Sequence, residues 1–381
     1  MNFIEKYKSG KEGKNLGLST GLSVLDKAIN GIQRKAMYGV GAGPKVGKTT
    51  LVDYCFVLSP YLKNPDVDIE WIYYSFEIDR VRKEFKYASF FFYYDYKITQ
   101  FSLPDNRKYM GSNTVEMNPN YLMGKMKDDD DNPIKVSKEH EEILKVIYEN
   151  RIIPLFGEYN SQGKRLKKGK IDFIEDRDNP TGLRNYLFSY AKSQGDFLTE
   201  SYKTQDDFGK PIEKKRIMGY KTKPEYEDKF TIVITDHIRK LRTERGYTLK
   251  QNVDKWIEYQ VELRNWVGFT FVNIVHLNRN ISSVERSKYL QEFLYPTGDD
   301  TKDTGNLSEE ADFFLTMFNA NDEKYKLDKH FGLKLREGSM KLYPNYRSIH
   351  VVESRDTVCP KHLKTNMYGG TNHFEHIHTQ N

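Results

Sequence analysis

A stretch of eight residues from Ala42 to Thr49 places glycine, lysine and threonine at spacings that suit a triphosphate. It matches the pattern of a phosphate-binding loop, or P-loop, except that Ala42 stands at the first glycine position. Backbone N–H groups and the start of the following helix would surround the phosphates, with Lys48 on the outer phosphates and the Thr49 hydroxyl on magnesium. The predicted nucleotide-binding residues are Gly43, Pro44, Lys45, Val46, Gly47, Lys48, Thr49 and Thr50.

Three further residues follow apolar runs that are typical of strands. Asp236 is the candidate for a second magnesium anchor, with a helix cap as its alternative role. Glu77 could orient or deprotonate the attacking water, and a surface glutamate is the alternative. His276 could contact the γ-phosphate, or it could be an ordinary core or surface histidine. Because parallel strands deliver functional residues at their carboxyl ends, we expect all three near the P-loop.

These residues need a scaffold of alternating strands and helices, which the apolar pattern predicts. Short β-branched runs predict strands buried on both faces, and apolar residues three and four apart predict helices. Strands are expected at 36–41, 69–76, 152–156, 230–235, 269–275, 313–319, 332–336 and 348–353, and helices at 48–58, 81–96, 138–148, 181–193, 251–266 and 308–312. The predicted fold is α/β, with a mostly parallel central sheet and helices on both faces.

The composition is that of a folded globular protein of 381 residues, with 38% hydrophobic and 14% aromatic residues. A total of 60 basic and 54 acidic residues leaves a formal charge of +6, so only local basic clusters could attract nucleic acid. Two cysteines cannot form a disulfide framework, and the chain has neither a secretion signal nor an apolar run of the roughly 20 residues that cross a bilayer. A cytoplasmic protein without a membrane span is expected.

The part of the chain between residues 104 and 223 departs from the alternating pattern. Residues 104–133 are polar and include the acidic run 128–131, so they are predicted to form a surface excursion that packs poorly. Residues 203–223 alternate polar and apolar side chains around a glycine, which predicts a hairpin. We interpret these segments as insertions into a single domain.

Taken in order, these segments resemble the RecA-like motor domain of DnaB-type, superfamily 4 replicative helicases. The resemblance is carried by residues 19–26, the P-loop, 75–78, 232–237, 276–279, 303–307, 310–312 and 353–355. It implies a RecA-like P-loop NTPase domain at 19–356, with insertions within 104–223, after a leader at 1–18 and before a polar tail at 357–381. The amino-terminal domain with which bacterial helicases contact primase is then expected to be absent.

For the site, the resemblance implies Glu77 as the catalytic base, Asp236 as the magnesium-linked carboxylate and His276 as the γ-phosphate sensor, where glutamine is usual. Arg355 matches the arginine that reaches into a neighbouring subunit's ATP site, and a plain salt bridge is its alternative role. Glu353 stands where the family generally has lysine, so catalysis between subunits could be altered. The predicted catalytic residues are Lys48, Glu77, Asp236, His276 and Arg355, and the predicted metal ligands are Thr49 and Asp236.

Basic residues follow Asp236 and His276, where the family has loops that hold one DNA strand at the centre of a ring. Lysine and arginine at such spacing can neutralise successive phosphates, although charge runs are often only solvated surface. The predicted DNA-binding residues are Arg239, Lys240, Arg242, Arg245, Arg279, Arg286 and Lys288.

The favoured function is an ATP- and Mg²⁺-dependent DNA helicase, a hexameric ring that moves 5′ to 3′ on single-stranded DNA, with primase or a loader as further partners. A phage source would place it in the host cytoplasm. The alternatives are a RecA/RadA-like recombinase and a regulatory or scaffold ATPase of a larger assembly. The tail carries Cys359, His362, His373, His376 and His378, which predict either a flexible segment or, less specifically, a zinc site.

Overall fold

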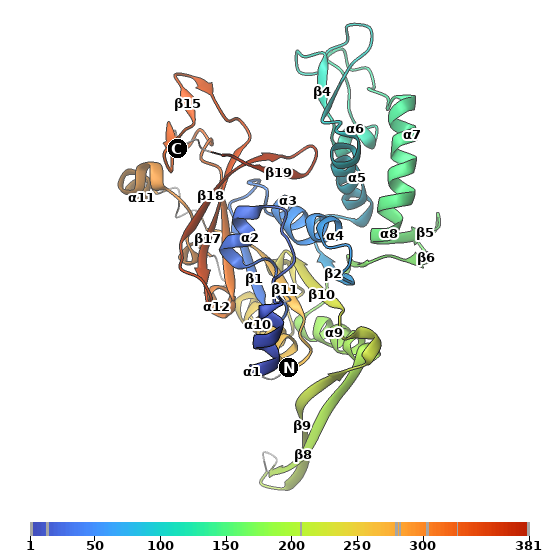
Figure 1. The fold of residues 1–381 in the computed structure, drawn as a ribbon, viewed down its shortest axis with the longest axis vertical. Coiled ribbons are helices and arrows are strands. Elements are labelled where there is room, and N and C mark those ends of the chain that lie inside the picture. The colour runs from blue at the N-terminus through green and yellow to red at the C-terminus, as the bar shows by residue number, and fades with distance from the viewer. Residues whose placement is uncertain are drawn as a thin grey trace.

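The computed structural model describes residues 3–12, 15–205, 208–278, 281, 283–301, 305–325 and 327–378. Across these residues the main sheet has nine strands in the order β19-β18-β17-β12-β1-β11-β10-β2-β7 (Figure 1). The strands from β12 to β7 in this order are parallel, and β17, β18 and β19 are antiparallel. Their bounds are β1 (Met37–Ala42), β2 (Ile69–Ser75), β7 (Ile171–Ile174), β10 (Phe230–Asp236), β11 (Thr270–His276), β12 (Phe313–Phe318), β17 (Tyr346–Ser354), β18 (Lys361–Tyr368) and β19 (His373–His376). The predicted α/β fold with a mostly parallel sheet is confirmed.

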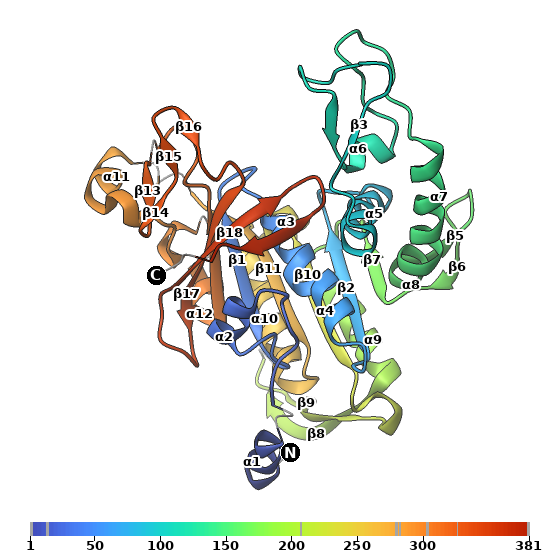
Figure 2. The same ribbon diagram turned by 45° about the horizontal axis from the view of Figure 1, so that its top comes forward.

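Helices cover both faces of this sheet, as predicted (Figure 2). Successive residues of a strand point to opposite faces, so Ile232 of β10 joins one core and Val233 joins the other. The first core packs beneath α2 (Ser23–Ile29), α3 (Lys48–Val52), η1 (Asp53–Leu58), α4 (Ser59–Lys63) and α5 (Arg80–Tyr96). The second packs beneath α9 (Pro180–Gln194), α10 (Leu249–Trp266) and α12 (Gly305–Glu310). Both faces of the central strands are therefore covered, which explains why these strands consist mainly of apolar and β-branched residues.

An arm built from the first half of the predicted insertion stands beside α5 (Figure 1). It consists of β3 (Gln100–Ser102), β4 (Thr114–Glu116), α6 (Pro119–Leu122), α7 (Lys138–Ile147), η2 (Tyr148–Ile152), α8 (Ile153–Phe156), β5 (Gly157–Tyr159) and β6 (Arg165–Lys168). The predicted strand at 152–156 is wrong, because Pro154 lies in the first turn of α8 and the run packs as a helix. Residues 104–133 also pack better than expected, since Met117 and Tyr121 are buried in the first core.

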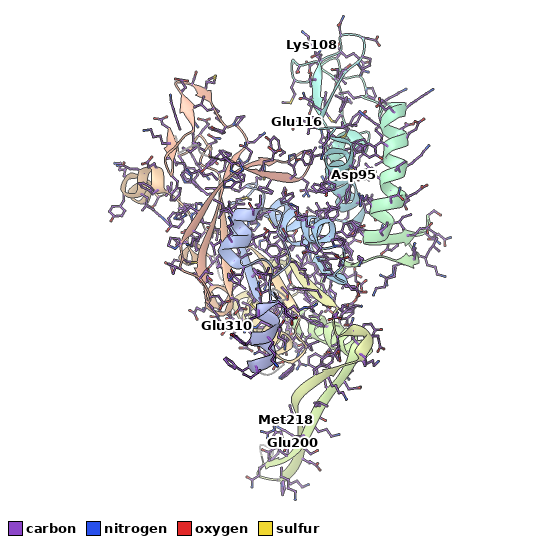
Figure 3. All side chains as sticks on the ribbon, in the orientation of Figure 1. Asp95, Lys108, Glu116, Glu200, Met218 and Glu310 are labelled. Carbon is purple, nitrogen blue, oxygen red and sulfur yellow. The ribbon has the colours of Figure 1, made fainter. Side chains whose placement is uncertain are left out.

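A long two-stranded ribbon forms the second half of the insertion, from β8 (Gly195–Gln205) and β9 (Pro211–Thr222). The predicted hairpin is confirmed, and it is longer than the sequence pattern indicated. Glu200 and Met218 lie on the part of the ribbon that projects away from the sheet (Figure 3).

The end of the chain differs most from the prediction. The predicted strand at 332–336 lies outside the main sheet, in the small hairpins of β13 (Lys329–His330) with β14 (Leu333–Lys334) and of β15 (Arg336–Glu337) with β16 (Met340–Lys341). Residues 361–376 form β18 and β19, so the interpretation of this segment as a flexible tail is wrong. Its histidines do not gather into a zinc site: His362 hydrogen-bonds to His350, and His373 stacks on Tyr93.

The remaining elements connect these parts. They are α1 (Phe3–Lys11), η3 (Pro224–Tyr226), η4 (Ile238–Lys240), α11 (Val284–Leu290), η6 (Gln291–Phe293) and η7 (Gly298–Asp300). Within the described chain, no helix combines the length and apolar character that crossing a bilayer requires.

Candidate nucleotide-binding site

The predicted P-loop is the turn between β1 and α3, at the carboxyl edge of the parallel strands. Gly47 has a φ of 116°, and a Cβ added there would lie 2.3 Å from the Sδ atom of Met367 on β18, so this position requires glycine. Lys45 also has a left-handed backbone, with a φ of 59°. No side chain caps the start of α3, so its first N–H groups are available to phosphate oxygens.

Lys48 is buried at the base of this loop. Its Nζ atom donates to the Gly43 carbonyl oxygen over 3.4 Å and lies 2.9 Å from Nδ1 of His276. An ammonium group only donates, so Nδ1 of His276 accepts and its neutral ring carries the hydrogen on Nε2. Burial lowers the pKa of Lys48 to about 8, against the opposing effect of Asp236 and Glu77.

Thr49 and Asp236 meet as a magnesium site requires. The Thr49 hydroxyl donates to Oδ2 of Asp236 over 3.1 Å, while Oδ1 of Asp236 is buried and has no hydrogen-bond partner among the described residues. Burial raises the pKa of Asp236, and Lys83 nearby opposes this rise. An unpartnered carboxylate oxygen beside a hydroxyl is a donor set that Mg²⁺ prefers, so these residues fit the ion.

Glu77, His237 and His276 converge at the carboxyl ends of β2, β10 and β11. One carboxylate oxygen and one nitrogen of each ring lie within 4.8 Å of one another. Burial lowers the pKa of His237 to about 2 and that of His276 to about 4, and the nearby cations act in the same direction. Both rings are therefore neutral at pH 7. Among the described residues, these three side chains form the group that could hold a metal ion. His237 is the one of the three that we did not predict as a site residue.

Arg355 lies far from this cluster within its own chain. Ser354 pairs with Phe313 at the start of β12, whereas the P-loop follows the end of β1. The Arg355 guanidinium donates to the carbonyl oxygens of Glu309 over 3.1 Å and Glu310 over 3.3 Å, at the end of α12. It is about half exposed. A phosphate contact from Arg355 therefore requires a second chain.

The predicted DNA-binding residues are in different environments. Arg239 and Lys240 lie in η4, near enough to His276 to affect its pKa, and Arg242, Arg245 and Lys288 are exposed. Arg286 instead pairs with the buried Asp300 over 2.6 Å and donates to the Tyr295 carbonyl oxygen over 2.9 Å. The Arg286 guanidinium thus has partners inside the chain, and its contact with DNA stays a prediction. Arg279 lies outside the described residues.

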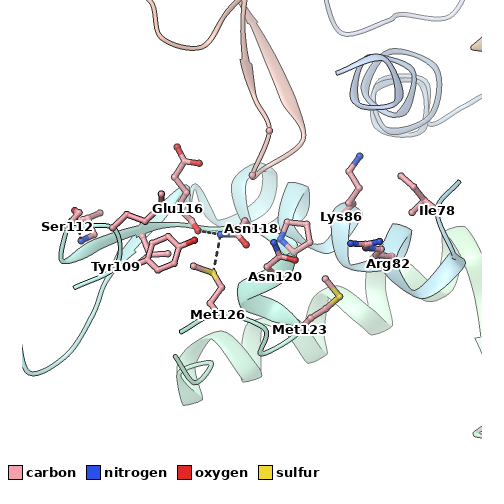
Figure 4. A pocket seen from close by; sticks show the side chains of 16 residues that line it. Ile78, Arg82, Lys86, Tyr109, Ser112, Glu116, Asn118, Asn120, Met123 and Met126 are labelled. Atoms are coloured by element: carbon pink, nitrogen blue, oxygen red, sulfur yellow. Dashed lines mark hydrogen bonds between the residues drawn. The ribbon is translucent and has the colours of Figure 1, made fainter. Parts of the chain in front are cut away.

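A cavity of about 860 Å³ lies between α5, the arm and the turn after β18 (Figure 4). Lys86 connects it to the P-loop helix, because its Nζ atom lies 3.4 Å from Oδ2 of Asp53, one turn after Thr49. The residues that line it include Ile78, Arg82, Lys86, Tyr109, Glu116, Asn120, Met123, Met126, Gly369 and Gly370. Cations thus lie at the end near the P-loop helix, and aromatic and thioether groups lie on the arm.

No protein-family model matches this chain, and no curated protein matches its sequence. Solved structures do match. One of them, the structure of an ATPase domain, superposes with a TM-score of 0.61 over 98% of this chain and 97% of that chain, at 12% identity. A DnaB-like replicative helicase, studied with its primase interactions, has a TM-score of 0.60 over 98% of this chain and 67% of that chain, also at 12% identity. The chain has the RecA-like fold. This fold is that of nucleotide-binding ATPase domains, which agrees with the P-loop geometry.

Proposed function

We propose that this chain is an ATP-dependent DNA helicase of the DnaB type, in which ATP hydrolysis drives movement along single-stranded DNA during replication. The observation that carries the proposal is the 3.1 Å contact between Thr49 and Asp236 beside Lys48, in a RecA-like fold similar to a DnaB-like replicative helicase. This contact supports the proposal because Thr49 and Asp236 are the two residues that we propose as magnesium ligands. ATP and Mg²⁺ are therefore the proposed ligands.

The residues at the strand ends suit phosphoryl transfer to water. Lys48 would exchange its contact with His276 for the outer phosphates, and Thr49 and Asp236 would hold Mg²⁺, which neutralises developing charge when bound. Glu77 would orient and deprotonate the attacking water. The Nε2 hydrogen of neutral His276 could then be donated to the γ-phosphate. His276 would thus take the role of γ-phosphate sensor that glutamine has in the family.

We place the nucleoside of ATP in the cavity between α5 and the arm. Its inner end adjoins the P-loop helix through Lys86 and Asp53. The volume of about 860 Å³ lies in the range of small-ligand sites, and its thioether and aromatic lining suits a flat base.

The active assembly is proposed to be a ring of identical chains, most simply a hexamer, because Arg355 cannot reach the phosphates of its own chain. An arginine supplied by a neighbour makes hydrolysis depend on assembly. Single-stranded DNA would pass Arg239, Lys240, Arg242, Arg245 and Lys288. Primase or a loader would be further partners of this ring, which we propose to act in the cytoplasm.

Unwinding of a forked duplex with ATP and Mg²⁺ tests the proposal, with Lys48→Ala as the inactive control. Electron microscopy with a non-hydrolysable ATP analogue and single-stranded DNA gives the second readout. Rings that unwind support the helicase. Filaments without unwinding would indicate a RecA/RadA-like recombinase, and ATP turnover without DNA binding would indicate a regulatory or scaffold ATPase.

A further inference from the structure

A buried polar network lies beside Asp236, under the helix that follows the P-loop. Asp53 is fully buried there, and its carboxylate accepts hydrogen bonds from Lys83 over 3.0 Å and 3.2 Å and from Lys86 over 3.4 Å. The hydroxyls of Tyr73 and Tyr87 donate to the same carboxylate over 3.0 Å and 3.2 Å. A buried ion pair is costly to form and breaking it costs more, so its position here needs a reason.

The hydroxyl of Tyr73 has two possible acceptors. The Lys83 ammonium donates to its oxygen over 2.8 Å, and because an ammonium group cannot accept, the Tyr73 hydrogen must point elsewhere. Oδ1 of Asp53 lies 3.0 Å away and Oδ2 of Asp236 lies 3.5 Å away. The single hydrogen is therefore directed at one of two carboxylates, and one of them is the proposed magnesium ligand.

Asp53 would lose less than Asp236 if the Tyr73 hydroxyl did not donate to it. Asp53 has other donors in Lys83, Lys86 and Tyr87. Oδ2 of Asp236 has Thr49 at 3.1 Å as its other donor among the described residues, and Oδ1 has none there. A second donor at Oδ2 would fix the carboxylate plane and leave Oδ1 free for the metal or its water.

We propose that Tyr73 is a positioning residue for the magnesium site: its hydroxyl, held by Lys83, donates to Oδ2 of Asp236 when magnesium and nucleotide bind. The Asp53–Lys83 pair serves as its support, because the Lys83 ammonium donates to the Tyr73 oxygen and leaves the hydroxyl hydrogen directed at the carboxylates. This inference rests on the proposed function, since it requires that Asp236 helps to hold magnesium.

Tyr87 provides a matched control. Like Tyr73, it is fully buried, and its hydroxyl donates to Oδ1 of Asp53. The two tyrosines differ at Asp236: among the described contacts, the hydroxyl of Tyr73 lies within hydrogen-bond distance of its Oδ2, and that of Tyr87 does not. Tyr73→Phe and Tyr87→Phe therefore each remove one phenolic hydroxyl that donates to Asp53. A loss that arises at Asp53 alone should appear in both variants.

The test is a Mg²⁺ titration of the binding of a fluorescent ATP analogue to the full chain, with unfolding in urea as a check on folding. Tyr73→Phe should raise the Mg²⁺ concentration at half-saturation about tenfold, the effect of one hydrogen bond to a charged group. It should leave nucleotide binding without Mg²⁺ unchanged, and Tyr87→Phe should shift the midpoint by less than about twofold.

Equal midpoints for Tyr73→Phe and Tyr87→Phe would overturn the inference. If Tyr73→Phe does not fold, the double variant Asp53→Leu with Lys83→Met serves as a background without the buried ion pair. Asp236 is the acceptor that this background leaves for Tyr73, so adding Tyr73→Phe to it should raise the Mg²⁺ midpoint about tenfold relative to the double variant, and an unchanged midpoint would overturn the inference. Nucleotide binding by the unaltered chain that is absent, or indifferent to Mg²⁺, would instead overturn the proposed function and this inference with it.

Discussion

Nζ of Lys48 lies 2.9 Å from Nδ1 of His276, and this contact joins the P-loop to the end of β11. The two groups come from opposite halves of the chain, and they meet because β1 and β11 are adjacent parallel strands whose carboxyl ends coincide. A phosphate that reaches Lys48 competes with His276 for the same ammonium hydrogens. Phosphate bound at Lys48 would therefore release Nδ1 of His276 at the end of β11.

The lowered pKa of Lys48 predicts that ATP affinity depends on pH. Burial gives Lys48 a pKa of about 8 in the free protein, and bound phosphates, which favour the charged form, must raise it. Binding therefore takes up a proton above about pH 8, and affinity should fall by up to about tenfold per pH unit as pH rises from there. Calorimetry between about pH 7.5 and 9.5 measures this slope.

The matched control for this titration is Lys45→Met, which removes an exposed lysine of the same loop. Its pH profile should follow that of the unaltered chain. An affinity that stays constant across the range would show that Lys48 keeps its ordinary pKa, or that it does not contact the phosphates.

Arg355→Ala should bind nucleotide normally and lose about a thousandfold or more in hydrolysis rate, because its guanidinium would stabilise charge in a neighbour's site. Mixing provides a sharper test. Subunits with Arg355→Ala retain an intact P-loop, and subunits with Lys48→Ala retain Arg355, so mixed assemblies contain some complete sites. Turnover should return on mixing. Full turnover by Arg355→Ala alone would remove the role between subunits.

Arg286 and Lys288 lie two residues apart and should respond differently to truncation. Arg286→Ala leaves Asp300 buried without its cation, and we expect the free energy of unfolding in urea to fall by about 2 kcal/mol. Lys288→Ala should change stability by less than about 0.5 kcal/mol. It should weaken binding to single-stranded DNA and reduce the slope of affinity against salt by about one. The reverse pattern would contradict both assignments.

If the cavity holds the nucleoside, a change in its lining should alter the affinity for ATP and leave the affinity for inorganic tripolyphosphate unchanged. Met123→Ala removes a thioether from the proposed nucleoside pocket, so ATP binding should weaken by about 1 kcal/mol while tripolyphosphate binding stays the same. Val146→Ala, on the exposed side of α7, is the control and should affect neither. Equal losses for both ligands, or none for ATP, would place the nucleoside elsewhere.

The sheet centre and the P-loop could be predicted because their signals are local. Residues of β10 are all buried, so the run from Phe230 is rich in β-branched residues, and the glycine at position 47 reflects a backbone angle. His237 was missed as a site residue because its role depends on three strands ending together, which no local pattern reports.

Other errors have related causes. The apolar run 152–156 has no period that separates a strand from a helix, and packing on the arm decides in favour of α8. Strand β18 contains Lys361, His362 and Lys364, a composition typical of solvated segments, and its place in the sheet follows from pairing with β17. Lys83 and Asp53 have the residue types of surface charges on two helices, whereas they neutralise each other in the core.

The cover of the P-loop comes from the far end of the sequence. Met367 of β18 packs against Gly47, and Nε of Arg347 at the start of β17 donates to the Val46 carbonyl oxygen over 3.1 Å. During translation the P-loop leaves the ribosome early, and about 320 further residues must follow before Met367 reaches it. Nascent chains that stop before β18 therefore carry a P-loop without Met367 over Gly47.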